Sequence, residues 1–205
     1  LNSIYFDGSD HLALPASHAD WNLGTGDFTL ECWFKHNAST AGDTQFISWQ
    51  GAGGNFGWES QGPTRTMTPY YYHGGYPAGT SGVGGNIDKN KSEWHHGVWT
   101  RHSGTLKFYL DGRELQSGAY TTDISSGTPL IGKYSGGQNY TGHLSNIRIV
   151  KGTAVYTSEF TPSTAPLTAI SGTVFLLNGV NFTDSSSTGH AITVGGDPKI
   201  ETDHP

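Results

Sequence analysis

Short runs of β-branched and aromatic residues, each followed by a cluster of Gly, Asn, Asp or Ser, recur along nearly the whole chain. The clearest run is FTLECWFK at residues 28–35, where every second residue is apolar. Its two faces would carry Phe28, Leu30, Cys32 and Phe34, and Thr29, Glu31, Trp33 and Lys35, respectively. This period of two indicates a half-buried β-strand. Helical periodicity is nearly absent, and its best candidate is one turn near residues 153–156, so the pattern predicts an all-β chain.

The turn residues support this prediction. The 205 residues include 30 glycines and 9 prolines, and pairs such as Asp111-Gly112 are typical of tight turns between strands. We expect strands at residues 3–6, 11–14, 27–36, 44–49, 56–60, 67–73, 93–101, 105–110, 113–117, 130–134, 142–150, 174–177 and 191–194. Many short strands with regular turns predict a β-sandwich, a jelly roll or a barrel.

Residues 1–205 are expected to form one domain, because β-sandwiches commonly reach this length without dividing. Residues 74–85 are rich in Gly, Pro and Ser and predict a loop. Residues 161–171, TPSTAPLTAIS, predict an extended crossing segment, since proline fixes the backbone and removes a donor. Residues 172–205 would then supply the C-terminal strands that close the sandwich.

Charge and cysteine content exclude several functions. The 11 basic and 17 acidic residues give a net charge of −6, which argues against nucleic acid as a partner. One cysteine cannot form an intramolecular disulfide. No apolar run approaches the roughly 18 residues that predict a membrane span, and no signal peptide is visible at the start.

Several stretches together resemble a known family. They are SIYFDGSDHLALP (3–15), GTGDFTLECWFK (24–35), EWHHGVWTRHSGTLKFYLDGREL (93–115), GHLSNIRIVKGTAVYTSEFTPSTAPL (142–167) and the final SGTVFLL and DSSSTGHAITVGGDP segments (171–198). Their order resembles the laminin-G-like domains of the concanavalin A-like lectin/glucanase superfamily, in the variant common in bacteriophage and bacterial surface proteins. The resemblance implies an antiparallel two-sheet jelly roll that binds glycans or proteins.

Catalysis is not expected. Glucanase relatives carry a Glu-x-Asp-x-x-Glu strand, which supplies the paired carboxylates that glycoside hydrolysis requires, and this chain lacks that triplet. No G-x-S-x-G nucleophile motif occurs. Cys32 lies among apolar neighbours, which favours a buried, inert thiol over a nucleophile.

Calcium is the candidate cofactor. The resemblance implies a Ca²⁺ site between an N-terminal loop and a C-terminal strand, and Asp7, Asp10 and Asp184 are the candidate ligands because Ca²⁺ prefers oxygen donors. The alternative is that these residues simply favour turns by bonding their own backbone. Zinc is not expected from the ten histidines: His95 and His96 point to opposite faces of a strand, and the others show no ligand spacing.

Aromatic residues in or near glycine-rich segments are the candidates for a binding surface. Trp58, Tyr71, Tyr76 and Tyr140 would contact a glycan or a protein partner, since loops on a rigid scaffold commonly carry binding residues. The alternative is that they belong to the core between the sheets.

Three functions remain open. The first is a non-catalytic virion structural or adhesion protein of a phage tail, fibre or capsid, which would contact other virion proteins or further copies of itself, and host-surface glycans. The second is a soluble carbohydrate-binding module of a bacterial surface protein or glycan-active enzyme. The third is a glycan-cleaving enzyme whose site has no recognised motif. The location expected for the first two is the virion or the cell exterior.

Overall fold

The computed structural model describes residues 2–37, 44–51, 54–61, 66–72, 92–125, 127–134, 137 and 139–205; for residues 44, 49–51, 54–61 and 66–72 it describes the strands without their side chains. The strands are β1 (Ser3–Asp7), β2 (His11–Ala13), β3 (Phe28–His36), β4 (Thr44–Gly51), β5 (Gly54–Gln61), β6 (Thr66–Tyr72), β7 (His95–His102), β8 (Thr105–Leu110), β9 (Arg113–Ala119), β10 (Gly127–Ile131), β11 (Thr141–Lys151), β12 (Thr173–Leu177), β13 (Thr193–Gly195) and β14 (Lys199–Glu201). The helix of the described residues is one 3₁₀ turn, η1 (Ala19–Trp21).

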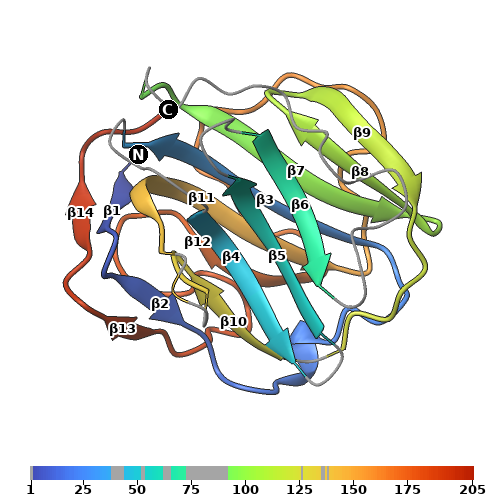
Figure 1. The fold of residues 1–205 in the computed structure, drawn as a ribbon, viewed down its shortest axis with the longest axis horizontal. Helices are drawn as coiled ribbons and strands as arrows, with labels where there is room; N and C mark the ends of the chain where they lie inside the picture. Colours follow the sequence, from blue (N-terminus) through green and yellow to red (C-terminus); the bar gives the residue numbers. More distant parts are fainter. Residues whose placement is uncertain are drawn as a thin grey trace.

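These strands form two antiparallel sheets, one in front of the other in Figure 1. The eight-stranded sheet has the order β14-β1-β11-β3-β7-β8-β9, with β12 also paired to β11. The six-stranded sheet has the order β13-β2-β10-β4-β5-β6. The N- and C-terminal strands β1 and β14 pair with each other, so both ends of the chain lie at one edge. The prediction of an all-β antiparallel sandwich is confirmed.

The core lies between the sheets and follows the alternation read from β3. The four apolar residues of that strand that share a face are almost completely buried in one cluster with residues of β1, β8, β11 and β12. Phe34 packs on Phe46 of the other sheet, with ring centroids 4.9 Å apart. Cys32 is a free, buried thiol whose pKa is raised by burial, in agreement with an inert core residue.

The outer face of the eight-stranded sheet is partly covered by residues 152–172, which we call the strap. The strap follows β11 and leads to β12 without helix or strand of its own, so residues 153–156, the best candidate for a helical turn, do not form one. The indole nitrogen of Trp33 donates to Ser163 O at 3.1 Å, and Phe160 N donates to Gly112 O at 3.0 Å. The face of β3 that carries Thr29, Glu31 and Trp33 therefore lies, over most of its length, beneath the strap.

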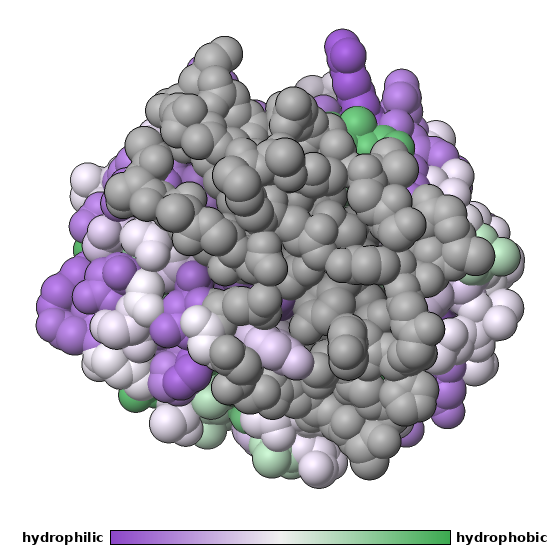
Figure 2. All heavy atoms as spheres, in the orientation of Figure 1, coloured by the Kyte–Doolittle hydropathy of each residue, from purple (hydrophilic) through white to green (hydrophobic). Residues whose placement is uncertain are grey.

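The described surface is mainly polar. In the view onto the six-stranded sheet, the described residues around its rim are mostly hydrophilic (Figure 2). Large apolar side chains that are exposed in the described residues are Ile170, Val180 and Val194. No helix in the described part of the chain is long and apolar enough to cross a membrane.

Candidate functional site

Three of the predicted binding residues have side chains outside the described residues. Trp58 lies in β5, opposite Pro69, and Tyr71 lies in β6, opposite Phe56. Tyr76 lies wholly outside the described residues. A role for these three in binding stays a prediction.

Tyr140, the fourth predicted binding residue, belongs to the core. Its side chain is 0% exposed and packs against the rings of Phe6 and Phe46. Its hydroxyl lies 2.8 Å from Lys35 O and 3.1 Å from His143 O, and donates to these carbonyls. Burial raises the pKa of Tyr140. A ring enclosed in this way cannot form an exposed platform, so the prediction for Tyr140 is corrected.

The carboxylates of Asp7 and Asp10 order the turn after β1. Asp7 accepts from Ser9 N at 2.8 Å and from the Ser9 hydroxyl at 2.7 Å, and these bonds lower its pKa. Asp10 accepts from Asp7 N at 3.0 Å and from Asp197 N at 2.7 Å. Asp10 thus ties this turn to the segment between β13 and β14.

Asp184, the third predicted calcium ligand, is buried in a different loop. Its two oxygens accept from the backbone N–H groups of Leu176, Ser186 and His190, at 2.8–2.9 Å. Asp7, Asp10 and Asp184 therefore do not converge as one ligand set. Calcium as a cofactor stays a prediction, but these three aspartates do not form one site for it.

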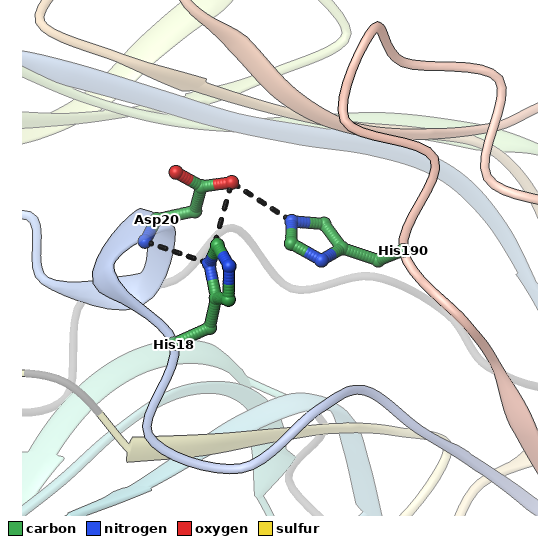
Figure 3. Close-up of side chains that lie close together, drawn as sticks. All are labelled: His18, Asp20 and His190. Carbon is green, nitrogen blue, oxygen red and sulfur yellow. Dashed lines mark hydrogen bonds and ion pairs between the residues drawn. The ribbon is translucent and has the colours of Figure 1, made fainter.

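A different group of possible metal ligands does converge within the described residues. It consists of His18, Asp20 and His190, with one ligand atom from each within 4.8 Å of the others. Figure 3 shows the three side chains pointing toward one another from two separate loops. Ligand spacing along the chain could not reveal this group, since Asp20 and His190 are 170 residues apart.

A buried charged cluster lies beneath the strap. Glu31 is 0% exposed, and its oxygen Oε1 accepts from Arg148 Nε at 2.8 Å. Its oxygen Oε2 accepts from the Tyr156 hydroxyl at 2.9 Å and lies 3.2 Å from His96 Nε2. Burial alone would raise the pKa of Glu31, but the hydrogen bond with His96 and the charge of Arg148 lower it below 4.5. Both oxygens are occupied and shielded, so this carboxylate fixes the strap to the sheet.

The rest of this outer face carries a partly exposed line of side chains that we call the outer-face row. Lys199, Tyr5, His143 and Lys35 occupy paired positions across β14, β1, β11 and β3. Their strand neighbours point into the core, so these four point outward. Trp94, just before β7, completes the row, and its ring centroid lies 6.1 Å from that of His143.

Two carboxylates from the C-terminal segment border the row. Glu201 lies 2.9 Å from His143 Nε2. Asp203 accepts from Trp94 Nε1 at 2.9 Å and also pairs with the Lys35 ammonium. Burial opposes ionisation of Asp203, but the hydrogen bonds from Lys35 and Trp94 lower its pKa. The row combines partly exposed rings with charged hydrogen-bonding groups, an arrangement that suits a ligand with both apolar and polar faces.

Sequence reasoning missed the outer-face row, although part of its signal was present. The alternation of Ile4, Tyr5 and Phe6 already assigns Tyr5 to the face away from the core. The row itself depends on strand order, because its members come from β14, β1, β11 and β3 and meet only through the ladder. No local motif encodes that order.

The comparisons with known proteins agree with this architecture. The family model for the concanavalin A-like lectin/glucanases superfamily matches residues 6–158. The chain belongs to this superfamily. No curated protein matches the sequence.

Several solved structures have folds similar to that of this superfamily domain. A candidate carbohydrate-binding protein from Bacteroides ovatus has a TM-score of 0.71 and 12% identity over 98% of this chain, which spans 59% of that protein. Domain 4 of the extracellular arabinanase AbnA from Geobacillus stearothermophilus, in complex with arabinotriose, has a TM-score of 0.57 and 17% identity, over 75% of this chain and 72% of that one. Domains LG4-5 of the mouse laminin alpha1 chain have a TM-score of 0.56 and 13% identity, over 80% of this chain and 48% of that one.

Proposed function

We propose that this superfamily domain is a non-catalytic carbohydrate-binding module whose ligand lies on the outer-face row. The observation that carries the proposal is the row itself: Tyr5, His143 and Trp94 present partly exposed rings beside Glu201 and Asp203. A sugar has C–H faces that pack on rings and hydroxyls that bond to carboxylates. The likeness to the Bacteroides ovatus protein and to the arabinanase domain in complex with arabinotriose supports the choice of ligand class.

The existing hydrogen bonds favour a preformed site. Asp203 holds Trp94 through its indole nitrogen, and Glu201 holds the ring of His143. A ligand that meets side chains already fixed in place loses less binding free energy to their ordering. Each carboxylate oxygen can also accept a further bond, since an ionised carboxylate has about four acceptor positions.

The test is a glycan array that includes arabino-oligosaccharides, followed by calorimetry with the best ligand. Trp94→Ala should weaken binding more than about tenfold, as expected for a central aromatic contact. Trp58→Ala, on β5, tests the competing location on the other sheet. If the ligand lies on the outer-face row, this variant should leave the affinity unchanged. The reverse result would move the site to the aromatic residues predicted from the sequence, and release of shorter sugars from the ligand would contradict a non-catalytic role.

The virion role inferred from the phage-type resemblance is a second, finer proposal. It requires large contacts with neighbouring chains, so it predicts a stable oligomer or co-purification with other particle proteins. Mass measurement in solution distinguishes it from a monomeric module at the cell exterior.

A further inference from the structure

His18, Asp20 and His190 bring three metal-ligating side chains together from opposite ends of the chain. His18 precedes η1 and Asp20 lies within it, whereas His190 belongs to the segment between β12 and β13. Oδ2 of Asp20 is the central atom: it lies 2.8 Å from His190 Nε2 and 3.5 Å from His18 Nδ1 (Figure 3).

The two separations from Asp20 Oδ2 match edges of a metal coordination shell, and one ligand atom from each of the three residues lies within 4.8 Å of the others. Nitrogen and oxygen ligands lie about 2.0–2.2 Å from a transition metal, so neighbouring ligand atoms are about 2.9–3.5 Å apart at tetrahedral or octahedral angles. Asp20 N donates to His18 Nδ1 at 3.2 Å, so this nitrogen carries no proton, as metal binding requires. The bond is exposed, and water can replace its acceptor when a metal takes the lone pair.

The donor set selects the class of metal. Two imidazole nitrogens and one carboxylate suit zinc and its neighbours in the first transition row, whereas Ca²⁺ and Mg²⁺ prefer oxygen ligands throughout. Three protein ligands leave a fourth tetrahedral position for water. Water can reach the site from the side of His18, whose side chain is 44% exposed, whereas the His190 side chain is 4% exposed.

The least exposed ligand is held firmly in place. His190 N donates to Asp184 Oδ2 at 2.8 Å, and the His190 ring lies 4.6 Å from the ring of Trp21. The indole of Trp21 is fixed in turn by a 2.7 Å bond to Pro15 O. Asp184 is thus a positioning residue, because it orders the loop that carries His190.

We infer that His18, Asp20 and His190 bind one zinc-class divalent cation that joins the N-terminal loop to the C-terminal loop. The cation would replace the contact between Asp20 and His190 with bonds to both residues and to His18. The site is structural, and it is separate from the outer-face row, whose residues it does not share.

The test uses untagged protein, freed of metal with a chelator, in titrations with Co²⁺ followed by visible absorption and with Zn²⁺ followed by calorimetry. The wild type should bind one equivalent and give the absorption bands of four-coordinate Co²⁺. His18→Gln and Asp20→Asn should each weaken Zn²⁺ binding at least about tenfold. Zn²⁺ should raise the melting temperature of the wild type and not that of either variant.

His102→Gln is the matched control, because His102 also pairs with an aspartate, Asp27 at 3.0 Å, but among the described residues no third metal-ligating side chain joins them. Its Zn²⁺ affinity should equal that of the wild type. Near-ultraviolet circular dichroism of the metal-free variants checks that they are folded. Equal affinity in wild type, His18→Gln and Asp20→Asn, or no Co²⁺ band in the wild type, would overturn the proposal.

Discussion

Strands β3 and β11 pass through two regions of the same outer face, and the two regions differ in what lies over them. At one end the strap covers Glu31 and Arg148, which are almost completely withdrawn from solvent. At the other end Lys35 and His143 remain partly exposed in the outer-face row. Both regions combine rings, carboxylates and cations.

The difference shows how a covering segment changes the role of similar side chains. Beneath the strap every oxygen of Glu31 has a protein partner, so the charged group contributes a fixed junction between β3, β11 and the strap. In the row the partners of Glu201 and Asp203 leave positions free for a ligand. The predictions below test this contrast, from the largest effect to the smallest.

Glu31→Gln should destabilise the domain the most. The variant leaves the charge of Arg148 buried without a counter-charge, which typically costs about 3–5 kcal/mol in the free energy of unfolding. Urea denaturation measures the loss. The double variant Glu31→Leu with Arg148→Met removes both charges and should be more stable than the single variant. If the double variant is the less stable of the two, the buried pair matters for a reason other than the unpaired charge.

The same carboxylate predicts an acid dependence. The pKa of Glu31 is lower in the folded protein than its ordinary value of 4.5, so its contribution to stability is complete above pH 4.5 and is lost as the pH falls through the folded pKa. At pH values below 4.5, the urea midpoint of the wild type should therefore decrease more steeply with falling pH than that of Glu31→Gln. Parallel curves for the two proteins would contradict this.

Gly112→Ala should detach the strap from the β8–β9 turn. Gly112 has a φ of +80°, and a Cβ there would lie 1.8 Å from Phe160 O. Strain and overpacking together should cost about 2–5 kcal/mol.

The control is Gly152→Ala, at the start of the strap, where φ is +82° and a Cβ would meet nothing within 4 Å. Its expected loss in the free energy of unfolding comes from the strained backbone conformation alone, about 1–2 kcal/mol. Thermal or urea unfolding of both variants gives the difference, and equal losses would mean that the contact with Phe160 contributes nothing.

Asp203→Asn should have the smallest effect on stability. Its ion pair with Lys35 is partly exposed, and such pairs contribute about 0–1 kcal/mol. Calorimetry should nevertheless show weaker glycan binding, because the variant removes a charged acceptor beside Trp94. A large loss of stability with unchanged glycan binding would mean that Asp203 has a structural role, like that of Glu31 beneath the strap.

The sequence predicted the sandwich because its signals are local. The alternation in β3 identified the core face of Phe28–His36, and the Asp111-Gly112 pair identified the turn between β8 and β9. What alternation cannot predict is a second covering layer. Glu31 and Trp33 share the face of β3 that points away from the core, and they are buried because the strap crosses them from more than 100 residues later in the chain.

The candidate site was less predictable for the same reason. Asp184 was singled out as a calcium ligand, but its oxygens accept from backbone N–H groups of its own loop, the alternative that turn chemistry offers. Tyr140 lies before β11 near glycines, as a loop residue would, yet the sandwich closes over it. The outer-face row depends on strand order, and the group of His18, Asp20 and His190 depends on contacts between distant segments, neither of which single-sequence patterns contain.

The position of β11 has a consequence for how the protein is made. One edge of β11 is shared by β1 and β12, and the other edge pairs with β3. A ribosome releases β1 and β3 long before β11, so the nascent chain carries strand edges whose partner does not yet exist. Such long-range pairing is slow, and unpaired edges invite aggregation. The yield of folded protein therefore depends on how well the growing chain is kept apart from its neighbours until residue 151 has been released.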